Sequence, residues 1–215
     1  MGVALAEEAL SKGARRVCLI HGPGVVVPNA LREVGDGRVH LDSVVTTQEM
    51  QDSVLSNLSI VGEYDILISA GAPADYTNLS PKTGKIKTSE KPSFKLELTA
   101  SKKIIAIAKE RFPKTFVVAF KAEHGSGYPE KISLEAQEVF KSSNADIVVA
   151  NDVGRTDIGF GSDFNEVSIL TKDGSVTKLP RESKNEIAAK ILDILVEEIS
   201  RCRKDIASKK GEKKF

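Results

Sequence analysis

Small residues, a carboxylate, an aromatic ring and two lysines follow one another in the first half of the chain. Residues 69–76 read Ser-Ala-Gly-Ala-Pro-Ala-Asp-Tyr, and Lys85-Ile86-Lys87 begins nine positions later. A strand is expected at 65–69, and small residues at a strand's end let a ligand approach the backbone closely. Ligands of open α/β sheets bind at that edge, and lysines add positive charge, so the pattern predicts a site for a phosphate-bearing substrate. The alternative is a Gly/Pro-rich loop with solvated lysines.

Further segments carry groups that can bind a nucleotide. Ser101, Lys102 and Lys103 begin an expected helix, where a hydroxyl and two cations lie beside helix amides that can bind an anion. Phe120 ends an apolar strand, where it could stack on a base, although a core position is the more common role of such a phenylalanine. Asn151 ends another strand with a polar group. The turn at 159–165 contains side chains that can bond nearby backbone, which predicts a structural role.

Length and composition restrict the class of protein. The chain has 215 residues, 40% hydrophobic and 28% charged, which predicts a soluble globular protein with a substantial core. The net charge of +1 gives no general attraction to nucleic acids or anionic lipids, so neither is an expected partner. Short apolar runs and an acidic N-terminal segment predict a cytoplasmic location without a membrane span or signal peptide. Two cysteines and three histidines show no metal-ligand spacing, so no metal site is expected.

Strands and helices alternate along the sequence, which predicts a mainly parallel sheet covered by helices. Capping boxes at 46–49 (Thr-Thr-Gln-Glu) and 183–186 (Ser-Lys-Asn-Glu) predict two helix starts, and Asp173-Gly174 predicts a hairpin. The expected fold is α/β, a Rossmann-like doubly wound, mostly parallel sheet with an antiparallel hairpin at one edge. Residues 1–207 are expected to form one domain and 208–215 a charged tail. Expected strands are 17–21, 42–45, 65–69, 94–98, 117–120, 146–150, 166–170 and 175–179; expected helices are 3–11, 46–58, 101–111, 133–143 and 183–206; 71–92 is an expected loop.

In order and spacing these segments resemble the phosphopantothenoylcysteine synthetase family, also called phosphopantothenate–cysteine ligase. The resemblance covers nearly the whole chain, and the joint order of the motifs is specific although each motif is short. The matching segments are 1–6 (Met-Gly-Val-Ala-Leu-Ala), 17–23, 46–50, 74–76, 85–87, 119–123, 150–152 and 161–165.

The family joins 4'-phosphopantothenate to L-cysteine through an amide in coenzyme A biosynthesis. The resemblance implies that the phosphopantothenate carboxylate attacks the α-phosphate of CTP or ATP, with CTP favoured, and that the triphosphate brings Mg²⁺. Pyrophosphate leaves, and the cysteine amine then displaces the nucleotide monophosphate. Negative charge builds on phosphate oxygens and then on a carbonyl oxygen, so the site needs fixed cations and hydrogen-bond donors more than an acid–base residue.

Carried over position by position, the resemblance implies roles for ten residues. Lys85 matches the lysine needed for turnover and is the expected catalytic residue. The nucleotide is expected against the backbone of the small residues that follow the strand at 65–69, with Phe120 beside its base. The expected nucleotide-binding residues are Ser69, Ala70, Gly71, Asp75, Lys85, Lys102, Lys103, Ile104, Ile105 and Phe120; no metal ligand is expected.

Two departures from the family pattern bear on function. Bacterial members carry two lysines in the helix before Asp146, where this sequence has Val139 and Ser143, with Lys141 as a substitute, so the nucleotide preference stays open. The family's upstream strand and Asn/Ser/Gly-rich loop, which contributes an asparagine to the site, precede Met1 and are expected to be missing. The alternative function is therefore a catalytically inactive or incomplete nucleotide-binding or assembly domain.

The resemblance also implies partners. A homodimer is expected, and a flavin-dependent decarboxylase is expected as a fused domain or a separate partner. A nicotinamide oxidoreductase is a weaker alternative, because Gly-Pro-Gly at 22–24 lacks the third glycine of the dinucleotide fingerprint and does not open a helix at once.

Overall fold

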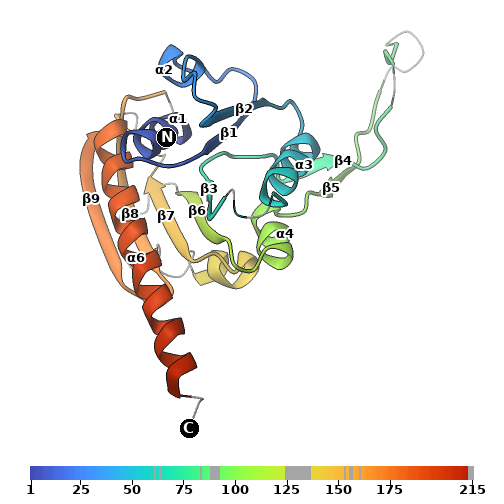
Figure 1. Cartoon of the computed structure of the whole chain (residues 1–215). Helices are drawn as coiled ribbons and strands as arrows, with labels where there is room; N and C mark the ends of the chain where they lie inside the picture. The colour runs from blue at the N-terminus through green and yellow to red at the C-terminus, as the bar shows by residue number, and fades with distance from the viewer. Residues whose placement is uncertain are drawn as a thin grey trace.

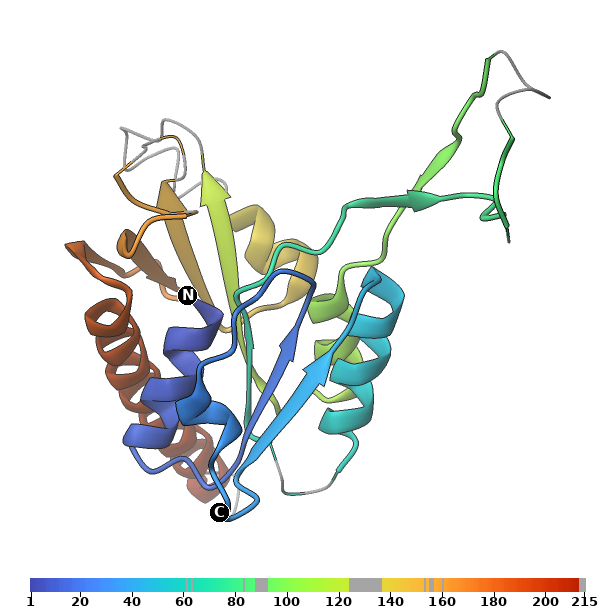
Figure 2. The same cartoon turned by 90° about the horizontal axis from the view of Figure 1, so that it is seen from above.

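Helices cover both faces of a central layer of strands (Figures 1 and 2). The computed structural model describes residues 1–60, 62, 64–82, 84–87, 93–123, 137–152, 154, 157–159 and 161–212. One face carries α1 and α6, and the other carries α3, α4 and a helical turn at 137–143 (Figure 2). The elements are α1 (Gly2–Ser11), β1 (Val17–His21), α2 (Asn29–Arg32), β2 (Val39–Ser43), α3 (Thr47–Leu58), β3 (Ile66–Ser69), β4 (Tyr76–Asn78), β5 (Leu98–Ala100), α4 (Ile104–Arg111), β6 (Phe116–Glu123), β7 (Ile147–Asp152), β8 (Phe164–Thr171), β9 (Val176–Ser183) and α6 (Lys184–Glu212).

Five strands form the main sheet in the order β3-β6-β7-β8-β9. The first three are parallel, and β8 and β9 are antiparallel to their neighbours, which confirms the α/β class and the hairpin at the edge. A separate parallel pair, β1 and β2, lies beside β3 (Figures 1 and 2). Among the described residues no ladder joins β1 to β3, so the expected doubly wound sheet is divided into two hydrogen-bonded parts. An antiparallel ribbon of β4 and β5 projects from the body (Figure 1).

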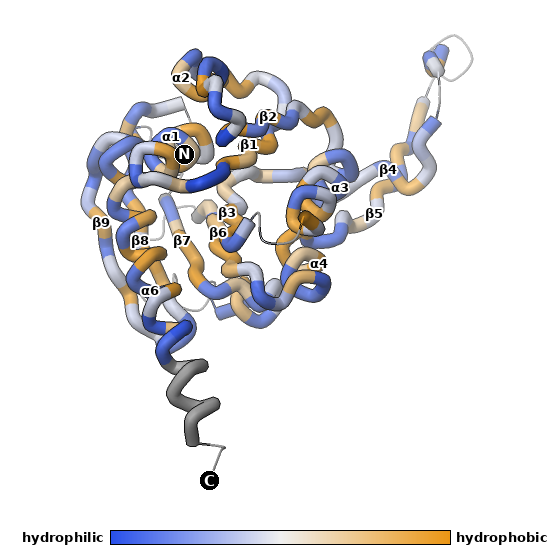
Figure 3. Tube along the Cα trace, viewed as in Figure 1, coloured by the Kyte–Doolittle hydropathy of each residue, from blue (hydrophilic) through white to orange (hydrophobic). Residues whose placement is uncertain are grey.

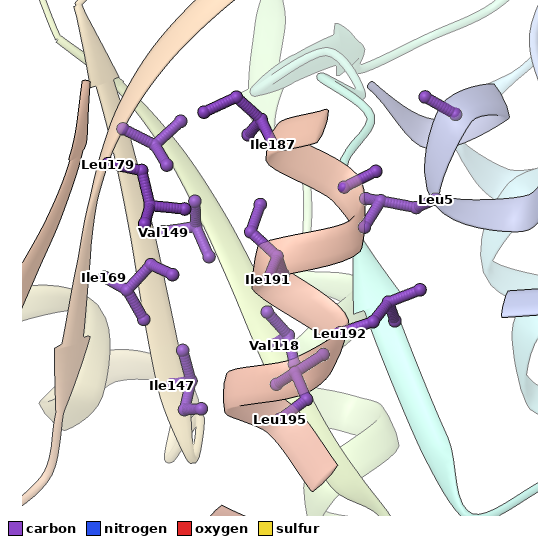
Figure 4. Packing of buried hydrophobic residues seen from close by; sticks show 13 residues of the cluster. Leu5, Val118, Ile147, Val149, Ile169, Leu179, Ile187, Ile191, Leu192 and Leu195 are labelled. Atoms are coloured by element: carbon purple, nitrogen blue, oxygen red, sulfur yellow. The ribbon is translucent and has the colours of Figure 1, made fainter. Parts of the chain in front are cut away.

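The core lies between the main sheet and the pair of helices α1 and α6 (Figure 4). Ile187, Ile191 and Leu195 recur every four residues along α6, are at most 1% exposed, and share a cluster with Val149 of β7. Leu5 brings α1 into the same cluster. Full burial of each such side chain contributes about 1.5–3 kcal/mol. None of the described helices combines the length and apolar composition needed to cross a membrane.

Both predicted capping boxes are present. At the start of α3 the Thr46 hydroxyl accepts a hydrogen bond from the Glu49 amide (3.1 Å), and the Glu49 carboxylate accepts one from the Thr46 amide (3.0 Å). At the start of α6, Ser183 and Glu186 exchange the equivalent bonds at 3.3 and 3.0 Å. These bonds satisfy amides that a helix start leaves without internal partners.

Removal of the first cap has a measurable cost. We expect Thr46→Ala to lower the free energy of unfolding by about 1 kcal/mol, because the Glu49 amide loses its acceptor. Urea denaturation monitored by circular dichroism measures this change. Ser56→Ala, at an exposed position within the same helix, is the control and stays within about 0.5 kcal/mol of the wild type. Equal urea midpoints for Thr46→Ala and Ser56→Ala would show that the cap adds nothing to the stability of the protein.

Some element boundaries differ from the predictions. The ladder of β2 with β1 begins at Val39, so β2 begins three residues and ends two residues earlier than expected. Only Leu19 of β1 is buried, because β1 pairs with one strand rather than lying inside a wider sheet. The helix expected from residue 101 begins at Ile104, and α6 continues past 206 to Glu212. The expected helix start at 133–136 lies outside the described residues.

The largest difference from the predictions concerns the ribbon. The expected loop at 71–92 contains β4, and β4 pairs with β5, which lies later than the strand expected at 94–98. The alternating residues that suggested the strand, Phe94, Leu96 and Leu98, are 47, 57 and 52% exposed. These three side chains therefore form one face of the ribbon. In the isolated chain this face is half exposed and does not pack on the core.

Candidate active site

A cavity of about 370 Å³ opens at the carboxyl ends of the parallel strands. Its walls come from the segment after β3, the start of α4, and the ends of β6 and β7. This volume lies in the range of about 300–1,000 Å³ that is usual for small-molecule sites. The position is also the one at which open α/β sheets bind ligands.

Nine of the ten predicted site residues line this cavity. The parallel ladder of β3 with β6 pairs Ser69 with Ala119, which places the following Phe120 beside the small residues that end β3. The Ser101 amide donates to the Asp75 carbonyl (2.8 Å), which joins the start of α4 to the same segment. The nine residues are Ser69, Ala70, Gly71, Asp75, Lys102, Lys103, Ile104, Ile105 and Phe120.

Lys85 is the predicted site residue that does not line the cavity. It lies in the segment between β4 and β5, is exposed, and belongs to the ribbon that extends away from the sheet (Figures 1 and 2). The expectation that Asp75, Lys85 and Phe120 share a cavity is therefore met for Asp75 and Phe120 only. Within one chain, the structure does not bring Lys85 to the other site residues.

An ion pair lies on the cavity wall between Asp75 and Lys103, with 2.5 Å between Oδ1 and Nζ. The hydrogen bond and charge of Lys103, with a further contribution from the charge of Lys121, hold the pKa of Asp75 below its usual value. The side chains of Asp75 and Lys103 are 69 and 63% exposed, so solvent screening leaves the pair little effect on stability. A phosphate that enters the cavity can therefore replace Asp75 as the partner of Lys103 with only a small loss of free energy.

The cavity suits an anion better than a cation. Four lysines line it, Lys102, Lys103, Lys121 and Lys184, whereas Asp75 is the single carboxylate among the described lining residues. The start of α4 adds amides that no side chain caps, and such amides attract negative charge. One ion-paired carboxylate is not a metal cage, so Mg²⁺ fits here only as an ion held mainly by phosphate oxygens.

The two positions at which the family resemblance implied lysines serve the fold in this chain. Val139 packs against residues of β6 and β7. Ser143 is 3% exposed, and its hydroxyl donates to the Val139 carbonyl (2.6 Å). Lys141 is exposed and is not among the described residues that line the cavity. The described helical turn at 137–143 therefore offers no lysine to a bound nucleotide.

Sequence reasoning missed a cluster on β1 and β2. Cys18 and His40 are opposite each other in the ladder, and potential ligand atoms of Cys18, His40 and Asp42 lie within 4.8 Å of one another. Asp42 is already engaged: it accepts from Ser53 Oγ (2.6 Å) and Asn57 Nδ2 (3.2 Å) and lies 3.0 Å from His40 Nε2. Burial, with the charge of Asp42, raises the pKa of Cys18 to about 12, so the thiol stays protonated at neutral pH. We therefore assign this cluster a structural role.

Further lining residues were not selected as site residues from the sequence. Lys121 directly follows Phe120, and Lys184 begins α6 within the second capping box. Asn151 was noted as a polar strand end, whereas Asn165 was placed in a structural turn. That turn does form as expected: Ser162 Oγ donates to the Asp157 carbonyl (2.9 Å). No local pattern marked Asn165, because its place on the cavity wall depends on the pairing of β8 with β7.

Comparisons with known proteins show which family the chain resembles. Residues 1–199 match the model of the DNA/pantothenate metabolism flavoprotein C-terminal domain. The chain is 35% identical over 193 residues to the coenzyme A biosynthesis bifunctional protein CoaBC of Thermococcus kodakarensis, and 34% identical over 193 residues to that of Bacillus subtilis. These matches cover 90 and 89% of this chain but 43% of each relative, so the chain spans less than half the length of these curated relatives.

Solved structures of related proteins are also similar to this chain. The crystal structure of the C-terminal domain of a coenzyme A biosynthesis bifunctional protein CoaBC matches with a TM-score of 0.66 and 28% identity, over 93% of this chain and 83% of that one. A DNA/pantothenate metabolism flavoprotein from Streptococcus pneumoniae, 21% identical with a TM-score of 0.70 over 90 and 86% of the two chains, supports the fold alone. The match over residues 1–199 also spans the segments that resemble phosphopantothenoylcysteine synthetases. The chain therefore belongs to the DNA/pantothenate metabolism flavoprotein C-terminal domain family, as the sequence predicted.

Proposed function

We propose that this chain is a phosphopantothenate–cysteine ligase of coenzyme A biosynthesis. The observation that carries this proposal is the cavity at the carboxyl edge of the sheet, where nine of the ten residues implied by the family resemblance lie together. Its excess of lysines suits a triphosphate and a phosphorylated acid. The names of the relatives, which are coenzyme A biosynthesis proteins, support a role in that pathway.

Each part of the cavity has a role in this reaction. The small residues at 69–71 let a nucleotide approach the backbone, while Lys102, Lys103 and the first amides of α4 hold its phosphates. A carboxylate oxygen of phosphopantothenate bonds to the α-phosphorus, and the bond from that phosphorus to the pyrophosphate oxygen breaks. The cysteine nitrogen then bonds to the acyl carbon, loses a proton, and releases the nucleotide monophosphate. Mg²⁺ brought with the triphosphate would supply further positive charge to its phosphate oxygens, beside Lys102 and Lys103.

CTP is the nucleotide that we propose, with ATP as the alternative. A pyrimidine occupies less of a cavity of about 370 Å³ than a purine does, and Phe120 on its wall offers a surface on which the base can stack. Calorimetric titration of the chain with CTP and with ATP tests this preference. We expect tighter binding of CTP.

We also propose a homodimer in which the ribbon of one copy reaches the other. Residues of hydrophobic type lie along the ribbon (Figure 3), and on one of its faces Tyr76, Phe94, Leu96 and Leu98 are 47–63% exposed. Such a concentration of exposed apolar surface is unusual outside interaction sites. A second copy can cover this face and, at the same time, receive Lys85 in its cavity. We further propose a flavin-dependent decarboxylase, fused or separate, as the enzyme that uses the product.

Pyrophosphate release tests the ligase assignment. The chain is mixed with Mg²⁺, CTP or ATP, and phosphopantothenate, with and without cysteine. We expect a single turnover of pyrophosphate without cysteine and continuous release with it, because the acyl-nucleotide must be consumed before the site can turn over again. Failure to bind either nucleotide would end the proposal. Nucleotide binding without pyrophosphate release would instead support the inactive-domain alternative.

Light scattering tests the dimer. We expect the mass of two chains for the wild type and the mass of one chain for the double variant Phe94→Glu/Leu96→Glu, because charges on this face oppose its burial. Val176→Glu, at an exposed apolar position of β9 away from the ribbon, is the control and keeps the wild-type mass. A wild-type monomer would contradict the homodimer.

A further inference from the structure

Asn165 is a buried amide whose hydrogen-bonding groups are unused. Its side chain is 0% exposed, and neither Nδ2 nor Oδ1 has a partner within the described part of the chain. Buried polar groups in folded proteins are almost always hydrogen-bonded, because an unpaired group loses its bonds to water and gains nothing in return. An asparagine kept in this state therefore calls for an explanation outside the folding of the chain.

The strand pairing places this amide on the wall of the cavity. Val167 of β8 pairs with Asn151 at the end of β7, and Asn165 lies two residues nearer the start of β8. Because β8 is antiparallel to β7, its first residues lie at the edge of the sheet where the parallel strands end. Asn165 accordingly lines the cavity together with Phe120 and Lys184.

A second unused group borders the same cavity. Ser101 Oγ is buried and has no partner among the described residues, and it lies on the wall formed by the start of α4. Within the described part of the chain, the buried side-chain atoms without a partner belong to Ser101 and Asn165 alone. The two residues come from elements that are far apart in sequence. Because both unpaired groups border the same cavity, a ligand in that cavity explains them better than two separate local packing defects.

We propose that Asn165 binds substrate, its carboxamide donating one hydrogen bond to, and accepting one from, an uncharged polar group. A phosphate or carboxylate offers only acceptors and would leave Oδ1 unpaired, whereas a neutral group with a donor beside an acceptor satisfies both atoms. Within the proposed function, on which this identification rests, two groups have that chemistry: the edge of the nucleotide base and the amide of phosphopantothenate. Ser101 Oγ supplies a second contact from the opposite element.

The amide is covered before a ligand binds, since Asn165 has no exposed surface. A ligand that reaches it must move a neighbouring side chain on the same wall.

Asn165→Leu tests the inference because it has opposite effects on stability and on binding. Leucine has a similar size and no polar atoms, so we expect an unliganded melting temperature equal to or above that of the wild type. We expect the dissociation constant of the contacted ligand to rise about 10- to 100-fold. Separate calorimetric titrations with CTP, ATP and phosphopantothenate identify the source: weakening confined to the nucleotides indicates the base, and weakening confined to phosphopantothenate indicates its amide.

Asn57→Leu is the matched control. Asn57 Nδ2 donates to Asp42 Oδ2 (3.2 Å) and to the Ser53 carbonyl (2.9 Å), and Asn57 does not line the cavity. We expect this variant to melt at a lower temperature and to keep its affinities. Affinities within twofold of the wild type in Asn165→Leu, or a fall in its melting temperature like that of the control, would overturn the inference. A wild type that binds none of the three ligands would overturn the proposed function, and the melting temperatures would still test the inference.

Discussion

Lys85→Gln lowers kcat of the proposed ligase by at least about 100-fold, while the chain keeps its fold. Glutamine preserves most of the side-chain length but removes the positive charge that stabilises phosphate and acyl oxygens in the two steps. Lys85 is exposed on the ribbon, so its replacement leaves the core intact. Pyrophosphate release measures kcat, and circular dichroism melting measures the fold. Lys82→Gln, an exposed lysine of the same ribbon, is the control and keeps its activity.

A mixing experiment separates a Lys85 that acts in its own chain from one that acts in a partner. We combine Lys85→Gln with Lys103→Ala, which we also expect to be inactive because it removes a cation that holds the nucleotide phosphates, and let the subunits exchange. If Lys85 enters the partner's cavity, each mixed dimer contains one complete site, and activity recovers to about a quarter of the wild type. No recovery after verified exchange would refute action across the dimer. Unchanged product formation by Lys85→Gln alone would refute the role of the lysine.

The second large effect is on stability. Asp146, just before β7, accepts hydrogen bonds from Lys109 Nζ (2.5 Å), the Val117 amide (2.8 Å) and Lys172 Nζ (2.9 Å). The side chains of Lys109 and Asp146 are 11 and 17% exposed. This network ties α4, whose first turn lines the cavity, to the main sheet.

We expect Asp146→Ala to lower the free energy of unfolding by about 3–5 kcal/mol, because it leaves the Lys109 ammonium buried without a counter-ion and the Val117 amide without this acceptor. Urea denaturation at neutral pH measures the change. The control is Lys172→Ala, which removes the partner that is 46% exposed and costs less than about 1 kcal/mol. If the two variants lost similar amounts of unfolding free energy, burial of the Lys109–Asp146 pair would not make it more stabilising than the exposed pair.

The same network gives stability a pH dependence. Burial alone would raise the pKa of Asp146, but the bonds from Lys109, the Val117 amide and Lys172 outweigh it and hold the pKa below its usual value of 3.8. A lowered pKa means that the unfolded state takes up a proton first as the solution becomes acidic. The contribution of Asp146 is therefore complete above the unfolded pKa and is lost as pH falls through the folded pKa. The difference between the wild type and Asp146→Ala should shrink between pH 5 and pH 3; a constant difference would argue against this linkage.

The sequence alone predicted those features that depend on neighbours in the chain. The Thr46 and Ser183 capping boxes form because their partners lie three residues away. The hairpin turn forms at Gly174, whose φ of +88° is strained for other residues. The family resemblance likewise predicted nine residues of the cavity, since each motif sits at the end of a strand or the start of a helix. Those ends meet at one edge whenever the strands are parallel.

Only the tertiary structure determined the features that depend on distant partners. The sequence placed Lys85 in the site, but the pairing of β4 with β5 carries it out on a ribbon. Asn165 looked like a turn residue, and its burial without partners on the cavity wall follows from the antiparallel placement of β8. Contacts between residues far apart in the chain depend on strand order and register, which no local pattern encodes. The sequence could therefore predict which strand and helix ends meet at the cavity, whereas it could not predict that Lys85 lies away from them.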